Sequence, residues 1–508
     1  MIYFRNAAEN PPAPAVVRTE KTRRTAGSPA ELTHMSLTRA IAGNTFVQVS
    51  GKFIGTLLGI LTVAVMTRHL GQAGYGEFTT AISFLQFFGI LVDFGLTLTM
   101  IRMISDAGAE ESRVASNIFT LRLVSGLVFF GAAAGIAQFF PYPPSVKAGI
   151  ALGSLSFLGI SLSSVLVGIF QKKLAVRLAA TAEVAGRLLL FLGVLFAARL
   201  GLSLLWVIGI LVASNLLQLS LSLVFAQKLV RVRPAFDLAL WREIVRQSWP
   251  IGVSIAFNLV YLKGDVIILS LYRTQSEVGL YGAAYKILDV ITIVPAVFMG
   301  LVLPVLTQAW SGGDSETFKR RLGRAFDFLS LIALPLAVGT QAVAADVMSF
   351  VAGSAFAASG RMLSILMLAG AMVFWSGLFG HAVVAMGLQK KMIWAYGLDA
   401  AVSLVLYLAL IPRYGAAGAA WVTVFSETFI ALATAAAVLY KMRGSVPLKT
   451  FSRALAASAI MYAVIVPLHQ VHVLWRVLIG MAVYAGLLLA LGVVTKDMLG
   501  QLRRPKTA

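Results

Sequence analysis

Long apolar runs separated by short polar segments dominate the pattern of hydrophobic and polar positions along the chain. The first run covers residues 45–67 and is interrupted only by Gln48 and Lys52. At about 1.5 Å per residue, such a helix crosses a hydrocarbon core about 30 Å thick. The Gly-rich residues 68–76 follow, and a second apolar run begins at residue 77. Because glycine disfavours helix continuation, the pattern predicts a loop over residues 68–76 that closes a membrane hairpin.

Runs of this kind continue along the chain and predict fourteen membrane-spanning helices. They cover residues 45–67, 77–104, 116–140, 148–170, 178–198, 204–226, 250–272, 281–308, 324–345, 361–386, 392–411, 416–440, 454–470 and 474–495. An even number of crossings puts both termini on the same side of the membrane. The predicted fold is all-α and polytopic, with about 14 transmembrane helices.

An internal repeat relates two parts of this helix series. A shift along the chain places Tyr75-Gly76 on Tyr281-Gly282, and each pair ends a turn between two spanning helices. The Leu200-Gly201 turn has a second counterpart at Tyr414-Gly415. Six helices separate the equivalent positions, so the repeat is parallel and its axis lies along the membrane normal. The sequence thus predicts two six-helix lobes, followed by two extra C-terminal helices.

These features divide the chain into six predicted segments. They are a disordered polar tail (1–36), an N-terminal lobe (37–226), an amphipathic linker (227–249), a C-terminal lobe (250–440), two additional transmembrane helices (441–495) and a basic tail (496–508). In the linker, Leu238, Trp241, Ile244, Val245 and Trp249 recur at helical spacing, which predicts a helix lying on the inner membrane surface. Two roles stay open for this helix, a spacer between the lobes or a binding surface for acidic head groups.

Composition and charge support a membrane protein and exclude several other classes. Of 508 residues, 59% are hydrophobic and 12% charged, with a mean hydropathy of +0.86. The net charge of +21 would suit nucleic acid, but the basic residues gather in alternate loops, such as Lys172-Lys173 and Lys390-Lys391. The positive-inside rule makes these loops and both termini cytoplasmic, so no nucleic-acid partner is predicted. Cysteine is absent, which excludes disulfides and thiolate metal sites.

Ionisable residues inside the predicted spans are the candidate functional groups. They are Lys52, Asp93, Arg122, Glu183, Arg187, Lys263, Asp265, Lys286, Asp289, Asp327, Asp399 and Glu427. A charge at mid-helix costs about 2.5–3.5 kcal/mol on insertion scales, so most must face protein or water. Arg122 and Asp327 lie near the inner surface, where they are predicted to snorkel. For Asp93, two roles stay open, a structural cap or pair and a functional group.

Spacing predicts which of these charges neutralise one another. Glu183 and Arg187 are four apart, with the acid first, and share one helix face. Lys286 and Asp289 can meet three apart in the same way, whereas Lys263 and its neighbour at position 265 point to nearly opposite sides.

Pro295 and Pro304 are predicted to bend the eighth helix. Gly51-Lys52 lacks the other residues of a phosphate-binding loop, and His469 and His472 have no nearby carboxylate, so no metal or cofactor is predicted.

Several loop and helix signatures together resemble a known transporter family. Asn44, Lys52, the segment RHLGQAGYG at 68–76, the segment DFGL at 93–96 and the matching hairpin at 249–308 are similar to polysaccharide flippases of the Wzx type. These belong to the multidrug/oligosaccharidyl-lipid/polysaccharide exporter superfamily. The resemblance implies two lobes around a cavity that opens alternately to each side of the bacterial inner membrane. It implies transport, without catalysis, of undecaprenyl-pyrophosphate-linked oligosaccharides to the periplasmic leaflet for exopolysaccharide, capsule or lipopolysaccharide O-antigen synthesis.

An anionic, sugar-bearing head group needs a polar, basic passage, and this assigns roles to the intramembrane charges. The predicted substrate-binding residues are Lys52, Arg122, Arg187, Lys263 and Lys286, with Glu183 and Asp289 as charge partners. Asp265, Asp399 and Glu427 are predicted to bind a coupling proton or sodium ion, since no nucleotide motif is present. A multidrug exporter or a lipid II flippase of the same superfamily is the alternative. A membrane glycan polymerase is a more distant one, which the short outer loops oppose.

Overall fold

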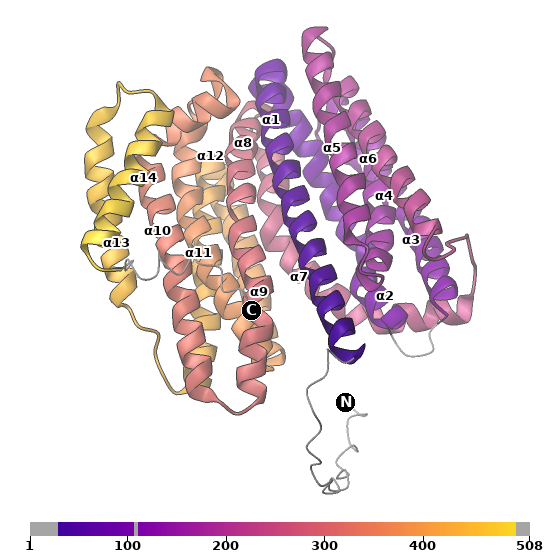
Figure 1. The fold of residues 1–508 in the computed structure, drawn as a ribbon. Coiled ribbons are helices and arrows are strands. Elements are labelled where there is room, and N and C mark those ends of the chain that lie inside the picture. Colours follow the sequence, from indigo (N-terminus) through magenta and orange to yellow (C-terminus); the bar gives the residue numbers. More distant parts are fainter. Residues whose placement is uncertain (1–28, 106–109, 494–508) are drawn as a thin grey trace, which may run out of the picture.

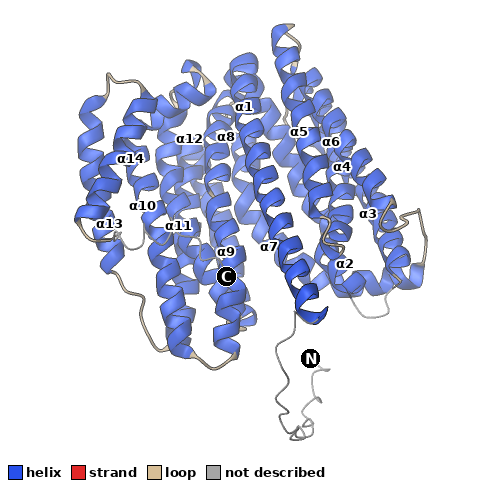
Figure 2. Cartoon of the chain, in the orientation of Figure 1, coloured by secondary structure: helices blue, strands red, loops and turns tan. Residues whose placement is uncertain are grey.

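The computed structural model describes residues 29–105 and 110–493, with side chains from residue 50 onward except those of residues 98, 250–251 and 253–263. Every regular element in this part of the chain is a helix (Figure 2). The helices form two groups that stand side by side, and α13 and α14 flank the second group (Figure 1). The predicted all-α fold is confirmed.

The N-terminal group contains α1 to α6. Their bounds are α1 Pro29–Asp93, α2 Leu96–Ser105, α3 Glu111–Ile136, α4 Pro144–Lys172, α5 Val176–Arg199 and α6 Leu204–Gln227, with the short η1 at Ala137–Phe139. The C-terminal group contains α7 Leu238–Tyr272, α8 Gln275–Ile291, α9 Ile293–Ser311, α10 Ser315–Ala352, α11 Ser359–Ala385 and α12 Gln389–Met442, with η2 at Ser354–Phe356. The additional helices are α13 Lys449–Ile465 and α14 Val473–Ala490, joined through η3 Val466–Leu468.

Two of these helices are double crossings. Eleven helical stretches are long and apolar enough to span a membrane, and two of them, Ser50–Asp93 and Gln389–Met442, hold 44 and 54 residues. One crossing needs about 20 residues. The first stretch is interrupted at Gly71 (φ 66°, ψ −174°) and the second at Gly415 (φ 59°, ψ −139°). With α7, which carries the seventh predicted span, the total agrees with fourteen crossings.

The predicted loop over residues 68–76 is wrong in its extent. Helix α1 continues through this segment and leaves helical geometry only at Gly71. Glycine adopts a positive φ without steric penalty, so one residue is enough to reverse the chain. The other glycines of the segment remain helical. Gly76 is needed for packing instead, because a Cβ there would collide with the carbonyl oxygen of Gln275 on α8.

Two other predicted helices are broken. The second predicted helix divides between α1 and α2 at Phe94 and Gly95, whose φ angles are 34° and 79°. The eighth divides between α8 and α9 at Thr292, three residues before Pro295. Proline lacks the N–H that would bond the carbonyl four residues earlier, so Pro295 accounts for this interruption, and the bend predicted there stays a prediction. Pro304 lies within α9 without interrupting it.

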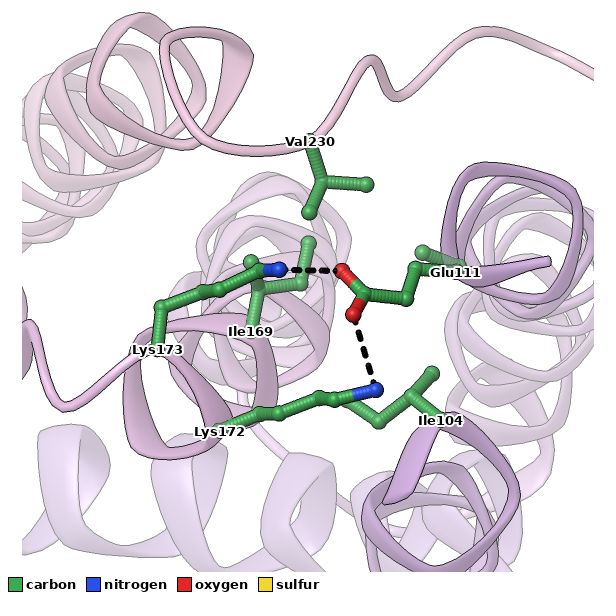
Figure 3. Close-up of a pocket in the computed structure, with 7 residues that line it drawn as sticks. Ile104, Glu111, Ile169, Lys172, Lys173 and Val230 are labelled. Atoms are coloured by element: carbon green, nitrogen blue, oxygen red, sulfur yellow. Dashed lines mark ion pairs between the residues drawn. The ribbon is translucent and has the colours of Figure 1, made fainter. Parts of the chain in front are cut away.

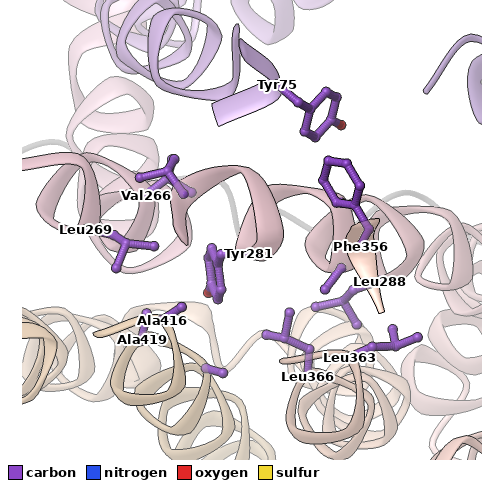
Figure 4. Packing of buried hydrophobic residues seen from close by; sticks show 14 of the residues in the cluster. Tyr75, Val266, Leu269, Tyr281, Leu288, Phe356, Leu363, Leu366, Ala416 and Ala419 are labelled. Atoms are coloured by element: carbon purple, nitrogen blue, oxygen red, sulfur yellow. The ribbon is translucent and has the colours of Figure 1, made fainter. Parts of the chain in front are cut away.

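The two groups of helices share one hydrophobic core near the turn at Gly71. Tyr75 of α1 and Tyr281 of α8 are both buried there, and the ring of Tyr75 lies edge-on to that of Phe356, with 6.1 Å between centroids (Figure 4). Small residues allow the backbones of α1 and α8 to approach closely. A Cβ on Gly279 would collide with the backbone of Gln72. The resemblance between the Tyr-Gly pairs of the repeat thus reflects a shared place in the lobe interface.

The turns gather at two opposite ends of the molecule. At one end, called the Gly71 end, His69 bonds the carbonyl of Leu202 at 2.7 Å and Arg273 donates to the carbonyl of Pro412 at 2.8 Å. At the other, called the Lys173 end, Lys173 pairs with Glu111 at the start of α3. The turns therefore alternate between the two ends as the loop pattern predicts.

Candidate functional site: the seam between the lobes and the charges along it

Polar contacts join the lobes at the Gly71 end. The guanidinium of Arg68 on α1 donates to the carbonyls of Phe350 and Val351 at the end of α10, at 2.6 and 2.5 Å. Gln72 donates to the carbonyl of Ala355 at 2.5 Å. Further along the seam, the hydroxyl of Thr80 donates to the side-chain oxygen of Gln275 at 2.7 Å, and the hydroxyls of Tyr142 and Ser270 lie 3.0 Å apart. The lobes are thus fastened to one another at this end.

On α5, the predicted pair of Glu183 and Arg187 is present. Arg187 donates through Nε and Nη2 to one oxygen of Glu183, at 3.0 and 2.8 Å. Its remaining nitrogen donates to the carbonyl of Gly55 on α1 at 3.1 Å, which is possible because Gly55 has no side chain in the way. The two charged side chains remain 42% and 40% exposed. Lys52, one turn from Gly55 on α1, is exposed.

Arg122 on α3 does not snorkel, and that prediction is wrong. Its side chain is fully buried and forms an ion pair with Asp93 at the end of α1. Nη1 donates to the hydroxyl of Ser164 at 2.7 Å, and Nη2 to that of Thr97 at 3.0 Å. Asp93 also accepts a hydrogen bond from Thr97 at 2.6 Å. The helix break after Asp93 therefore coincides with a buried polar network inside the N-terminal lobe.

Three carboxylates predicted to bind a coupling ion are buried in the C-terminal lobe. Asp265 on α7 accepts a hydrogen bond from the hydroxyl of Tyr281 at 2.7 Å. Asp399 and Glu427, on the two halves of α12, accept from Ser426 at 2.7 Å and from Ser376 at 3.2 Å. Within the described residues no three His, Cys, Asp or Glu side chains converge as a metal site. Each acid thus accepts a hydrogen bond from a hydroxyl group on another helical segment.

The remaining predicted bases differ in what the structure describes. Lys286 and Asp289 on α8 lie 3.9 Å apart with about half of each side chain exposed, as their spacing predicts. Lys263 belongs to α7, but its side chain lies outside the described residues. His472 accepts a hydrogen bond from the N–H of Leu474 at 3.3 Å and so caps α14.

Sequence reasoning missed several contacts that shape the site. Arg476 of α14 pairs with Asp346 of α10 and donates to the carbonyl of Ala342 at 2.7 Å, which fixes the additional helices against the C-terminal lobe. Glu277 of α8 accepts from the N–H of Ala416 at 2.7 Å, at the start of the second half of α12. No periodicity or spacing reports either contact, since each joins segments more than a hundred residues apart.

At the Lys173 end, two lysines share one carboxylate. Lys172 and Lys173 at the end of α4 approach different oxygens of Glu111, at 2.9 and 2.7 Å, over a floor of Ile104 and Ile169 (Figure 3). The basic loop predicted between the fourth and fifth helices is therefore partly neutralised. The trio ties the start of α3 to the end of α4.

Comparison with known proteins matches the chain to a family model and to two curated proteins described as probable flippases. Residues 41–310, just over half of the chain, match the family described as "Polysaccharide biosynthesis protein". In Haloferax volcanii, "Probable low-salt glycan biosynthesis flippase Agl15" is 24% identical over 73% of this chain and 78% of its own length. "Probable flippase AglR" of the same organism is 23% identical over 47% of this chain and 52% of its own length.

The fold is also similar to solved transporter structures. The lipid II flippase MurJ in an inward closed conformation superposes with a TM-score of 0.73 at 15% identity, over 90% of this chain and all of that one. An inward-facing multidrug resistance MATE family transporter gives a TM-score of 0.59 at 13% identity, over 78% of this chain and 98% of that one. Because the family match covers more than half of the chain, the chain belongs to the family described as "Polysaccharide biosynthesis protein".

Proposed function

We propose that this protein moves undecaprenyl-pyrophosphate-linked oligosaccharides from the cytoplasmic to the periplasmic leaflet of a bacterial inner membrane. The observation that carries the proposal is a set of accessible positive charges on helices that meet at the lobe seam. Lys52, Arg187 and Lys286 lie on α1, α5 and α8, and each is exposed by more than a third. Exposed charges within spans are too costly to face lipid. They therefore favour a water-filled passage between the lobes.

The passage suits a pyrophosphate head group. Counting about 1.5 Å per residue from the helix ends, Lys52 lies about 28 Å from the Gly71 turn, and Arg187 and Lys286 lie near mid-membrane. Because the bases lie at different depths, a phosphate can move from one base to the next without being bound too tightly by any of them. Arg187 can exchange its carboxylate partner for phosphate, which a guanidinium binds in the same planar geometry. The polyprenyl tail stays in lipid throughout.

Alternating access then requires the seam to open at the Gly71 end. The Arg68 and Gln72 bonds to backbone carbonyls close that end in the described state, so they must break before substrate is released there. The positive-inside rule assigns the Lys173 end to the cytoplasm. This supports uptake from the cytoplasmic leaflet and release to the periplasmic side.

We also propose that a proton or sodium gradient drives the cycle through Asp265, Asp399 and Glu427. Buried carboxylates that accept bonds from hydroxyls can take up a cation when the surrounding helices move. Two of these acids lie on α12, which bends at Gly415 between them, so cation uptake can alter the angle between the halves of α12.

Leaflet transfer in reconstituted vesicles tests the proposal. Purified protein is incorporated with a fluorescent lipid-linked repeat unit, and a membrane-impermeant quencher reports its side of the bilayer. We expect transfer with protein and none with vesicles that contain an Arg187→Ala/Lys286→Ala variant. Growth of the glycan chain in the same vesicles would instead assign a polymerase. Transfer of lipid II alone, or of organic cations alone, would assign the alternative transporters.

A further inference from the structure

Residues 238–249, the first part of α7, form a helix with three distinct faces, here called the linker helix. Trp241, Ile244 and Ser248 face the N-terminal lobe, where Ile244 and Ser248 are fully buried and the indole N–H of Trp241 donates to Asn117 at 3.1 Å. This face is already used for packing. The other two faces have no comparable role in the fold.

The second face is an exposed apolar stripe. Leu238, Val245 and Trp249 follow one another at intervals of seven and four residues, so they lie on one line along the helix. They are 74%, 46% and 53% exposed. Phe236, just before the helix, is 69% exposed. Such a row next to a polar surface is typical of a helix that lies in the membrane interface.

The third face is basic and borders the stripe. Arg242 and Arg246 are one helical turn apart, and both are exposed. Neither arginine forms an ion pair among the residues that the structure describes. Glu243, three residues before Arg246 and away from the stripe, accepts a hydrogen bond from Gln247 at 2.7 Å. The helix therefore offers two free guanidinium groups next to apolar side chains.

A cavity opens beside the same helix. It holds about 230 Å³ and is lined almost entirely by apolar side chains of α1, α2, α3 and the linker helix: Leu91, Val92, Phe94, Leu96, Leu121, Ser125, Phe129, Val245 and Ser248. Phe129 and Val245 in its wall are exposed, so the cavity reaches the surface. Val245 belongs both to the cavity wall and to the apolar stripe. A chain that enters the cavity therefore passes next to the two arginines.

The location is that of lipid head groups at the Lys173 end. Asp237, immediately before the linker helix, pairs with Arg113 in the first turn of α3, beside the Glu111 trio. Basic residues at this depth attract anionic lipids by about 1 kcal/mol each. The cavity is smaller than pockets that enclose a whole small ligand, so it suits one segment of an acyl chain and not an entire polyprenyl carrier.

We propose that the linker helix is a binding site for an anionic glycerophospholipid of the membrane. Arg242 and Arg246 hold the phosphate, Leu238 and Trp249 lie at the acyl boundary, and one acyl chain enters the cavity past Val245. The bound lipid anchors the segment from which α7 crosses to the C-terminal lobe. None of the residues that line the cavity is one of the bases Lys52, Arg187 and Lys286 that are proposed to carry the substrate.

Native mass spectrometry of the full-length protein with added phosphatidylglycerol or phosphatidylcholine tests the site. Since each base contributes about a fivefold factor in affinity, Arg242→Gln/Arg246→Gln should weaken phosphatidylglycerol binding about 25-fold. Binding of phosphatidylcholine should stay unchanged. The matched control is Lys390→Gln/Lys391→Gln, which removes two exposed charges at the same end, and it should retain the tight site.

Two further variants keep the test decisive. Arg242→Lys/Arg246→Lys retains the charges and should retain most of the binding, even if the glutamine variant is produced poorly. Ser125→Leu fills the cavity without touching either arginine and should also weaken phosphatidylglycerol binding.

Equal losses in the Arg242/Arg246 and Lys390/Lys391 variants would overturn the proposal. Displacement of phosphatidylglycerol by equimolar lipid-linked oligosaccharide would assign the surface to the substrate and overturn it as well. The binding and displacement measurements do not depend on transport, so they can fail while the proposed function stands, and the reverse also holds.

Discussion

The two lobes treat their intramembrane charges differently. In the N-terminal lobe, the acids are paired with bases, Asp93 with Arg122 and Glu183 with Arg187. In the C-terminal lobe, Asp399 and Glu427 are buried among hydroxyls and have no basic partner within the described residues. A paired carboxylate is held in its charged form and stabilises one arrangement. A carboxylate bonded only to hydroxyls can gain and lose a cation without breaking an ion pair. The paired acids of the N-terminal lobe thus suit a structural role, whereas Asp399 and Glu427 suit the coupling role proposed for them.

The largest expected effect comes from breaking the buried pair of the N-terminal lobe. Asp93→Asn leaves the guanidinium of Arg122 fully buried without its counter-charge, which typically costs about 3–5 kcal/mol. We expect a strong loss of folded protein and a lower melting temperature in detergent. The double variant Asp93→Asn/Arg122→Met removes both charges and should recover much of that stability. If the single variant is as stable as the wild type, the pair does not hold the helix break together.

Substitution of the buried acids in the C-terminal lobe should reduce transport and leave stability unchanged. Asp399→Asn and Glu427→Gln keep the hydrogen bonds to Ser426 and Ser376 but remove the charge. We expect normal abundance and melting temperature, with gradient-driven transfer in vesicles reduced at least tenfold. Exchange of substrate without a gradient should persist. The control is Glu316→Gln, which removes a carboxylate in the first turn of α10 whose side chain is 83% exposed. Transfer that still responds to the gradient in both variants would exclude these acids as the coupling site.

Two bases that helix length places near mid-membrane should respond in transport rather than in stability. Lys263→Ala and Arg187→Ala are expected to retain normal abundance and to lose most transfer, about tenfold or more, because each removes a positive charge near mid-membrane. Lys263→Arg should retain part of the activity, since the charge persists with altered geometry. Measuring abundance and transfer together separates the two roles. A parallel loss of both would make the residue structural.

Features repeated locally along the chain could be predicted, and contacts between distant segments could not. Hydropathy predicted the crossings, and spacing predicted the pairs of Glu183 with Arg187 and of Lys286 with Asp289, because a helix brings residues three or four apart together. The pairing of Arg122 with Asp93 depends on how α3 packs against the end of α1. Depth along the helix suggested snorkelling, but depth says nothing about which face a side chain occupies.

The turn at Gly71 also shows that sequence composition does not reveal what each residue contacts. A run rich in glycine indicated a reversal, yet only one glycine takes a positive φ, while Gly76 serves the contact with α8. Both roles require the absence of a side chain, and composition alone cannot separate them. The seam contacts of Arg68 and Gln72 end on backbone carbonyls, which leave no mark in the sequence.

The smallest expected effect concerns an ion pair outside the membrane, Arg113 with Asp237. The hydrogen bond from Arg113 lowers the pKa of Asp237, and the N–H of Leu240, which Asp237 caps, lowers it further. A carboxyl whose pKa is lower in the folded state stabilises the fold above its unfolded pKa of about 3.9 and loses that contribution as the pH falls through the folded value. Asp237→Asn keeps the cap, because asparagine is as good an N-cap as aspartate. We therefore expect little change in melting temperature at pH 7 and a slightly weaker loss of stability between pH 5 and pH 3 than in the wild type. Because both side chains are partly exposed, 0.5 M salt should reduce the difference in stability between Asp237→Asn and the wild type. The same salt should leave the effect of Asp93→Asn unchanged. A large, salt-independent effect at Asp237 would mean that this pair, like the one at Arg122, is screened from water.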